Sequence, residues 1–178
     1  MHESSMQAMK NFIEKYLDRE TELAILDVGS LQCDKTSATY KTLFDSSKWH
    51  YLGLDLVWGG NVDIKSDNPH YYPFRDSYFD VIVSGQALEH IARPWVWIKE
   101  IYRLLRNDGI LCVIAPSGGK RHFDKDYWRI MPDGLEELFE CAGLKKVEII
   151  RNKKGKWKDV TGIARKSIHY PTVVKGYT

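Results

Sequence analysis

Three carboxylates, Asp27, Asp55 and Asp67, each lie at or just after the end of a short apolar stretch of the chain. Such stretches are typical of buried parallel strands, whose carboxyl ends meet at the edge of a sheet where ligands bind. A carboxylate at that edge can accept hydrogen bonds from both hydroxyls of a ribose or from the amino group of a base. The acids therefore indicate a nucleoside-binding edge.

The turn after Asp27 carries a single glycine, Gly29, because Ser30, Leu31 and Gln32 follow it. A dinucleotide site would use G-x-G-x-x-G, so that a pyrophosphate can dock at a helix N-terminus, and a P-loop would also add a lysine. Both patterns are absent, which favours a nucleoside cofactor without phosphate. S-adenosylmethionine is such a cofactor. We assign to it Asp27, Gly29, Ser30, Asp55 with its neighbour Leu56, and Asp67.

A fourth apolar stretch runs into "VSGQALEHI" (83–91), which offers polar groups for both cofactor and acceptor. Ser84 and Gln86 are expected to line the cofactor. His90 can take a proton from an acceptor hydroxyl, since the unperturbed pKa of histidine is about 6.5. It could equally hold the loop or orient the acceptor. For Glu89 we favour a role in orienting the start of the next segment over a role as a base.

Four motifs in this order, "ILDVGS", "YLGLDL", "PFRDSYFDVIVSGQALEHI" and "IYRLLRNDGILCVIAPS", resemble the class I S-adenosylmethionine-dependent methyltransferases, in their small type 11 branch. The resemblance covers roughly residues 23–150. The later "DKDYWRIMPDGLEELFECAGL" resembles a subgroup associated with bacterial surface-polysaccharide and sugar modification. It implies transfer of a methyl group to an oxygen of a sugar or of a small hydroxylated or anionic metabolite. The chain departs from the family at the first motif, where only Gly29 remains of several glycines.

The segment "PSGGKRHFDKDYWRIMPDG" (116–134) follows the fifth apolar stretch and therefore begins at the same edge. Connections longer than about 12–15 residues are usually functional or disordered, and its aromatic and charged residues favour order. We expect it to form the acceptor wall, with His122 and Arg129 facing the methyl group as catalytic residues. The alternative is a surface loop whose aromatic residues pack on the last helix.

Apolar spacing predicts an α/β fold of the Rossmann-like, doubly wound type, with helices on both faces of a mostly parallel sheet and a C-terminal antiparallel hairpin. We expect one methyltransferase domain over 1–178, with an N-terminal helix at 5–18 and a core at 23–166. The expected strands are 23–28, 50–56, 61–64, 78–85, 110–116, 145–151 and 157–166.

Local signals place the helix ends. Asp34 is expected to cap a helix, and Pro94 to begin another that ends at "NDG" (107–109). Asp133 with Glu136 forms a D-x-x-E capping pattern, and Gly143 is expected to end that helix.

Composition excludes several classes of protein. The formal net charge of +2 over 178 residues is too small to indicate a nucleic-acid or membrane partner. No apolar run is long enough for a membrane helix, and the N-terminus has no signal-peptide core, so we expect a cytoplasmic protein. Three scattered cysteines argue against a disulfide framework or a zinc site, and we expect no metal. The chain could form a homo-oligomer.

Three rival functions compete with methyl transfer. The missing glycines could mark a non-catalytic methyltransferase-like module with weak or no cofactor binding. A nicotinamide-dependent oxidoreductase lacks its G-x-G-x-x-G motif here, and a nucleic-acid methyltransferase lacks an N-P-P-Y-type motif and a basic excess.

Overall fold

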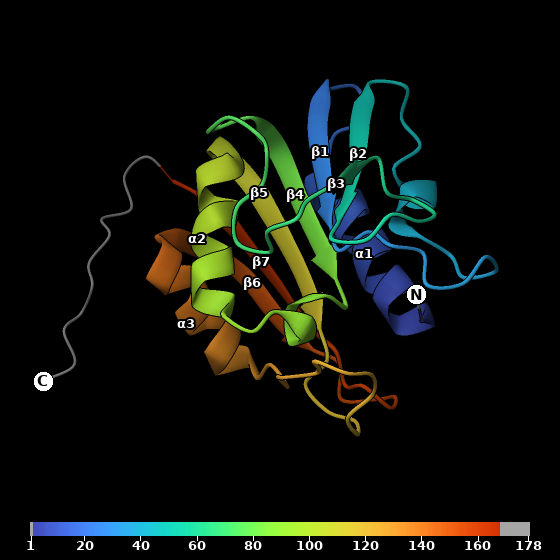
Figure 1. The fold of residues 1–178 in the computed structure, drawn as a ribbon. Helices are drawn as coiled ribbons and strands as arrows, with labels where there is room; N and C mark the ends of the chain where they lie inside the picture. The colour runs from blue at the N-terminus through green and yellow to red at the C-terminus, as the bar shows by residue number, and fades with distance from the viewer. Residues whose placement is uncertain (1, 168–178) are drawn as a thin grey trace, which may run out of the picture.

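A seven-stranded sheet forms the centre of the molecule, with the strand order β3-β2-β1-β4-β5-β7-β6 (Figure 1). The structure is a computed structural model that describes residues 2–167; Met1 and residues 168–178 of the expected domain lie outside the described part. The strands are β1 (Leu23–Val28), β2 (Trp49–Asp55), β3 (Ile64–Lys65), β4 (Phe79–Gly85), β5 (Leu105–Ala115), β6 (Leu144–Arg151) and β7 (Val160–Lys166). Among the strands of residues 2–167, β7 alone runs opposite to the other six, and it pairs antiparallel with β5 and β6. The mostly parallel, Rossmann-like sheet with a C-terminal antiparallel pair is confirmed.

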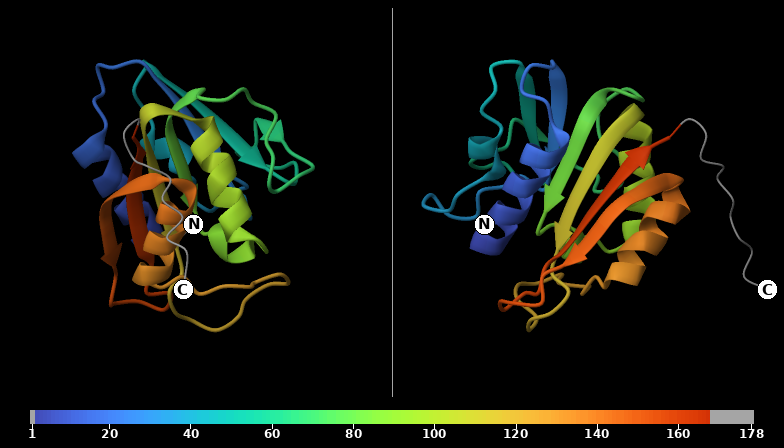
Figure 2. Two further views of the ribbon diagram at one scale, coloured as in Figure 1. Left: turned by 90° about the vertical axis from the view of Figure 1, so that its left-hand side faces the viewer. Right: turned by 180° about the vertical axis from the view of Figure 1, so that it is seen from behind.

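Helices cover both faces of this sheet. They are α1 (Glu3–Tyr16), α2 (Pro94–Leu104) and α3 (Pro132–Ala142), with the short 3₁₀ helices η1 (Tyr40–Leu43) and η2 (Leu88–His90). Figure 2 shows α1 on one side of the sheet and α2 with α3 on the other. Met9 and Phe12 of α1 pack with Val83 on the first face, whereas Trp97 of α2 and Phe139 of α3 pack with Ile82 on the second. Alternate side chains of β4 thus enter two separate apolar layers.

The chain changes direction across the sheet between β1 and β4. From β1 it proceeds outward to β2 and β3, then returns to add β4 on the other side of β1. This is the topological switch point of a doubly wound sheet, and ligands bind there at the carboxyl ends of the strands.

The helix expected after Asp34 is wrong, because only a short 3₁₀ helix forms in this region. Asp34 accepts hydrogen bonds from the backbone N–H groups of Thr36 and Ser37 (both 2.9 Å), which forms a local turn. Only Tyr40–Leu43 becomes helical, as a 3₁₀ turn. Threonine and serine compete with the backbone for hydrogen bonds, so the sequence "KTSAT" (35–39) does not support a helix.

Several other boundaries differ from the expectation. The first helix spans Glu3–Tyr16 where 5–18 was expected, and the last strand begins at Val160 where 157 was expected. Helix α2 ends at Leu104, because Leu105 is already extended and pairs with Phe79 at the start of β5. The "NDG" sequence is therefore an irregularity inside β5, with Asp108 at a φ of 61°. The third strand was expected at 61–64 and occupies only Ile64–Lys65.

The start of α3 also corrects the expected capping pattern. Met131 is the N-cap residue and Pro132 the first helical residue, and no side chain caps this end. The fixed φ of proline suits that position, so Pro132 begins the helix in place of Asp133. The end is confirmed: Gly143 has a φ of 80° and donates its N–H to the carbonyl oxygen of Glu140.

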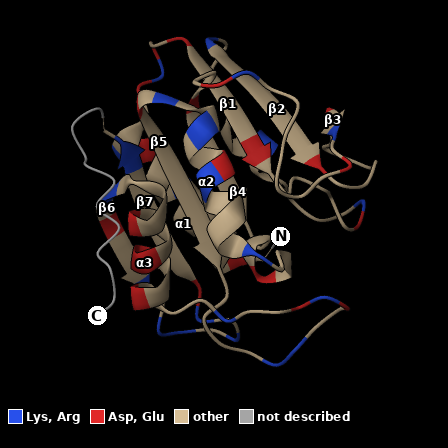
Figure 3. Cartoon of the chain, turned by 60° about the vertical axis from the view of Figure 1, so that its left-hand side comes forward, with Lys and Arg blue, Asp and Glu red and all other residues tan. Residues whose placement is uncertain are grey.

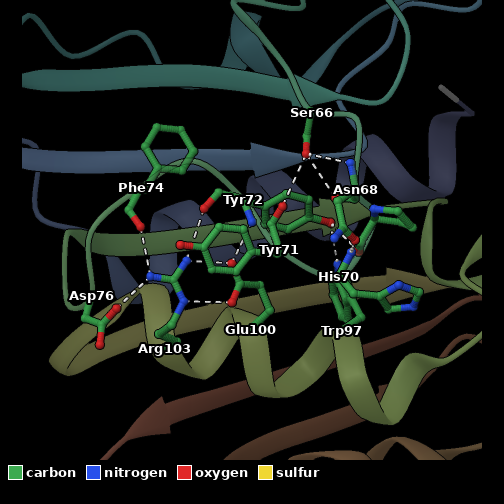
Figure 4. Close-up of polar contacts among 11 residues, drawn as sticks. Ser66, Asn68, His70, Tyr71, Tyr72, Phe74, Asp76, Trp97, Glu100 and Arg103 are labelled. Carbon is green, nitrogen blue, oxygen red and sulfur yellow. Dashed lines mark hydrogen bonds and ion pairs between the residues drawn. The ribbon is translucent and has the colours of Figure 1, made fainter.

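A buried polar network attaches the segment 66–76 to α2 (Figure 4). Glu100, only 6% exposed, accepts hydrogen bonds from the backbone N–H of Tyr72 (2.7 Å) and from the guanidinium of Arg103 (2.6 Å). Arg103 also donates to the carbonyl oxygens of Tyr72 (3.1 Å) and Phe74 (2.8 Å), and the indole N–H of Trp97 donates to the Tyr72 hydroxyl (3.1 Å). Tyr72 is thereby fixed from both its backbone and its ring.

We predict that Arg103→Met lowers the free energy of unfolding by about 2–4 kcal/mol, because it leaves the Glu100 carboxylate buried without its cationic partner. Arg106→Met is the matched control. Arg106 makes a single ion pair with Asp80 and is 46% exposed, so its loss should cost less than about 1 kcal/mol. Urea unfolding of the three proteins measures the difference, and equal costs for both variants would contradict the prediction.

Candidate cofactor and acceptor site

A cavity of about 850 Å³ opens at the carboxyl ends of β1, β2 and β4, at the switch point. Binding sites for small ligands usually measure about 300–1,000 Å³. Residues from β1 and its turn, from β2, from the start of η2 and from the segment after β5 line it. Those that carry the argument below are Asp27, Gly29, Ser30, Leu31, Tyr40, Asp55, Leu56, Asn61, Tyr72, Gln86, His90, His122, Phe123 and Trp157. In Figure 3, acidic residues colour the strands β1 and β2 that lead into this edge.

The turn after β1 brings the backbone close to the cavity. Gly29 has a φ of 83°, and a Cβ atom placed on it would lie 2.4 Å from Cβ of Ala87, so only glycine fits. The following residues 30–39 form a loop without an α-helix, so the turn after β1 does not lead into a helix N-terminus that could bind a pyrophosphate. This arrangement argues against a dinucleotide.

Two glycines of the facing loop make room for the residues that replace the family's glycines. A Cβ atom on Gly59 would lie 2.4 Å from Cδ1 of Leu31, and one on Gly60 would lie 2.7 Å from Oε1 of Gln32. The backbone N–H of Gln32 also donates to the carbonyl oxygen of Gly60 (2.9 Å). The side chains of Leu31 and Gln32 therefore pack against the loop after β2, and the cavity remains open beside them.

Asp27 is buried at the base of the cavity, with an exposed fraction of 2%. Its Oδ2 accepts a hydrogen bond from the hydroxyl of Tyr51 (2.5 Å), whereas Oδ1 has no partner among the described residues. Burial raises the pKa of Asp27 to about 7, and the nearby charge of Asp55 acts in the same direction. A cation entering the cavity would satisfy Oδ1 and restore the ionised form.

Asp55, the last residue of β2, lines the same cavity. Its Oδ2 accepts a hydrogen bond from the backbone N–H of Leu31 (3.1 Å), and its Oδ1 accepts from those of Leu56 (2.7 Å) and Val57 (3.3 Å). A carboxylate offers about four lone-pair directions, which leaves capacity for a ribose hydroxyl. Ser30 lines the wall as well, where its hydroxyl donates to the carbonyl oxygen of Asn61 (2.7 Å).

The structure does not bring two of the expected cofactor residues to the cavity. Asp67 points into solvent, where its side chain is 90% exposed and forms an ion pair with Lys65. Ser84 is buried in the sheet, and its hydroxyl donates to the carbonyl oxygen of Val28 (2.8 Å). Gln86 does line the cavity, with a φ of 57° and its side-chain amide donating to Asp159 (3.2 Å).

His90 and His122 also line the cavity, with their ring centroids 5.3 Å apart. Nδ1 of His90 lies 3.1 Å from the carbonyl oxygen of Lys125, and Nδ1 of His122 lies 3.0 Å from Oδ2 of Asp126. Both partners are acceptors, since the guanidinium of Arg129 holds the pKa of Asp126 below its usual range. Each Nδ1 therefore donates to its acceptor, and Nε2 is the ring nitrogen left for a ligand.

Arg129 does not line the cavity. Its guanidinium donates to both oxygens of Asp126 (2.5 and 2.8 Å) and to the carbonyl oxygens of Trp128 (2.7 Å) and Lys120 (2.8 Å). It thus fixes the segment between β5 and α3 and positions Asp126 under His122. Trp128 is also turned away from the cavity, because its indole N–H donates to the carbonyl oxygen of Ile91 (2.9 Å).

Several lining residues were missed from the sequence. Tyr40 and Tyr72 line the cavity, and Trp157 enters it from the β6–β7 connection. Tyr51 does not line it but donates its hydroxyl to Asp27. His2 reaches the rim because Ser4 donates to Asp159 (2.7 Å), which also binds Gln86. Only Asn61 carried a signal, since asparagine is enriched where φ is positive, and its φ is 65°.

Comparison with known proteins agrees with this geometry. Residues 31–113 match the family model described as a methyltransferase domain. This match covers 83 of the 178 residues, which is less than half of the chain. The rice (Oryza sativa subsp. japonica) 2-methyl-6-phytyl-1,4-hydroquinone methyltransferase 2, chloroplastic, is 35% identical over 95 residues, or 51% of this chain. The rice 2-methyl-6-phytyl-1,4-hydroquinone methyltransferase 1, chloroplastic, is 28% identical over 144 residues, or 78% of this chain. The chain spans only 27% and 38% of the two proteins' lengths.

Solved structures share the fold at low sequence identity. The Burkholderia thailandensis 1,6-didemethyltoxoflavin-N1-methyltransferase, bound to 1,6-didemethyltoxoflavin and S-adenosylhomocysteine, superposes with a TM-score of 0.72 at 19% identity, over 93% of this chain and 79% of that one. The methyltransferase in a complex with the Haloferax volcanii Trm112 methyltransferase activator gives 0.71 at 15% identity, over 92% and 91%. These likenesses show that the chain shares the fold of the two methyltransferase structures.

Among residues 2–167, no helix has the length and apolar character needed to cross a membrane.

The buried carboxyl of Asp27 should make stability fall as pH rises. Its pKa is about 7 in the folded state and 3.8 in an unfolded chain, so between these values the folded state holds the additional proton. At 1.36 kcal/mol per pKa unit, this penalty grows by about 2–3 kcal/mol between pH 5 and pH 8. Glu89, whose pKa burial raises to about 7, acts in the same direction.

We predict that Asp27→Asn, which keeps an acceptor for Tyr51, gains stability over the wild type by about that amount as the pH rises from 5 to 8. Asp133→Asn, a surface acid on α3, controls for the loss of one negative charge. Urea unfolding at both pH values is the measurement. Parallel profiles for the wild type and Asp27→Asn would disprove the assignment of this proton.

Proposed function

We propose that this chain transfers the methyl group of S-adenosylmethionine to an oxygen of a sugar or of a small hydroxylated or anionic acceptor. The observation that carries the proposal is the cavity at the switch point, with the unpartnered Oδ1 of Asp27 at its base and Asp55 at the end of β2. S-adenosylmethionine has a cationic amino group and a ribose diol, which are the groups that these two carboxylates would bind.

The cofactor's fit follows from the groups that line each part of the cavity. Asp27 would accept from the ammonium group, and Asp55 from a ribose hydroxyl beside its bond to Leu31. Gly29 lets the backbone approach the ligand, while Leu56 and Tyr72 offer apolar and aromatic surface for the adenine. The cofactor supplies an already activated methyl group, so the protein's task is to bind and orient the acceptor in line with it.

The acceptor would bind at the end of the cavity formed by His90, His122 and Phe123. The free Nε2 lone pairs of the histidines can accept the proton of an acceptor hydroxyl. Phe123 is 74% exposed and offers a flat surface for a ring. The sugar acceptor and a role in surface-polysaccharide synthesis rest on the resemblance of the segment 124–144, and the hydroquinone in the relatives' names adds phenols to the acceptors worth testing.

We predict that Asp55→Ala weakens the binding of S-adenosylmethionine and S-adenosylhomocysteine at least tenfold. A hydrogen bond to a charged acceptor contributes roughly 1.5–3 kcal/mol, and about 1.4 kcal/mol corresponds to one decade in affinity. Asp67→Ala is the matched control, since this acid lies outside the cavity, and it should change affinity by less than about twofold. Isothermal titration calorimetry of both ligands, with a thermal melt of each variant, provides the test.

Equal affinities for Asp55→Ala and the wild type would remove Asp55 from the cofactor site. No binding by the wild type at millimolar cofactor would overturn the proposed function and favour a non-catalytic methyltransferase-like module.

A further inference from the structure

Glu89, His90 and His122 lie together at the acceptor end of the cavity. Each offers one ligand atom within 4.8 Å of the other two, and Oε1 of Glu89 lies 3.8 Å from Nε2 of His90. Glu89 and His90 belong to η2, whereas His122 comes from the segment after β5. Hydrogen bonds from the backbone N–H groups of Tyr127 and Trp128 to the carbonyl oxygen of Glu89 (2.8 and 3.3 Å) fix the two elements side by side.

The surroundings of both histidines leave the same nitrogen free. Nδ1 of His90 donates to a backbone carbonyl, and Nδ1 of His122 donates to Asp126, which Arg129 keeps ionised. Histidines that bind metals almost always donate their other N–H to a carbonyl or a carboxylate in this way, because that bond fixes the tautomer and the ring orientation. The Nε2 atoms of both rings are therefore prepared to act as ligands.

Glu89 lacks the partner that a buried carboxylate requires. Its exposed fraction is 0%, and neither side-chain oxygen has a hydrogen-bond partner among residues 2–167. The nearby cation, Arg129, is occupied by Asp126 and by backbone carbonyls. A buried carboxylate without a partner is costly, so the arrangement is complete only when a cation or a proton joins it.

We propose that Glu89, His90 and His122 bind a divalent transition-metal ion. Two imidazole nitrogens and one carboxylate form a common ligand set for zinc and for ferrous iron, and this set leaves coordination positions open. Both histidines line the cavity and are about 30% exposed, at 31% and 27%, so the open positions would face the acceptor. No sequence motif indicates this site, because His122 lies 32 positions after His90 and no cysteine takes part.

The role of this metal rests on the proposed function, whereas its binding does not. An acceptor hydroxyl that coordinates the ion becomes more acidic, as water does on zinc. Its proton would leave to solvent, its oxygen would form a bond to the methyl carbon as the carbon–sulfur bond breaks, and S-adenosylhomocysteine would remain. A metal-free proton relay through the histidines would use the same lone pairs, so the two mechanisms exclude each other.

The experiment is a titration of untagged, chelator-treated protein with Co(II) and with Zn(II). Co(II) bound by imidazole and carboxylate gives visible absorption bands, which report binding without any activity. We expect one ion per chain and a rise in the melting temperature, since an ion bound only by the folded state stabilises it. Glu89→Gln and His122→Ala should each weaken binding at least tenfold, and Asp126→Asn by about 10–100-fold, the usual effect of losing a partner of a ligating histidine.

His50→Ala is the matched control, because His50 lies exposed on β2, away from the cluster. It should bind the metal as the wild type does. Glu89→Gln removes a buried charge and so should fold, which separates loss of the ligand from loss of the fold. Absence of saturable binding, or unchanged affinity in Glu89→Gln and His122→Ala, would overturn the site.

Calorimetry with S-adenosylhomocysteine on the chelated protein distinguishes the two proposals. Cofactor binding without metal binding would leave the proposed function standing and refute the metal site. Metal binding without cofactor binding would support the metal site and refute the proposed function.

Discussion

Parallel pairing of β1 with both β2 and β4 is the constraint on which the rest of the molecule depends. This pairing places three strand ends side by side, and each end contributes a group to the cavity: Asp27 with Gly29, Asp55, and Gln86. The apolar layers on the two faces of the sheet hold β1 in the centre, so its buried carboxyl is tolerated there. A shift of β1 by one residue would exchange its faces and move Asp27 out of the cavity. Register, more than any single side chain, thus determines the site.

The single glycine of the first turn shows how a lost pattern can be replaced by packing. A family motif rich in glycine keeps side chains out of the space beside the ligand. Here the space is kept free from the other side, because Gly59 and Gly60 of the facing loop receive Leu31 and Gln32. The steric requirement is the same, but its glycines come from another part of the chain. The missing glycines of the first turn are therefore no argument for the non-catalytic alternative.

The sequence predicted which segments form the strands, the two covered faces and the approximate edge of the site, because apolar periodicity reports burial directly. The predictions were less accurate for side chains that can form more than one set of contacts. Asp34 could cap a helix or close a turn. The residues that follow it have low helix propensity, so a turn forms there. Arg129 and Asp67 had suitable charges, but ion pairs with Asp126 and Lys65 turned both away from the cavity. The contacts of Tyr51 and Trp157 depend on pairing across long sequence distances, which no local pattern contains.

Two buried acids determine the electrostatics of the site: Asp27, which lines the cavity, and Glu89, which lies beside the cavity residue His90. Burial raises the pKa of both Asp27 and Glu89 to about 7, and each has at least one oxygen without a partner in the described chain. A group in this state is poised between binding a proton and binding a cation. At Asp27, the cation would be the ammonium group of the cofactor. At Glu89, it would be a metal ion or the proton of the acceptor. The ammonium group is present in both S-adenosylmethionine and S-adenosylhomocysteine, so Asp27 would contribute equally to the binding of the cofactor before and after methyl transfer.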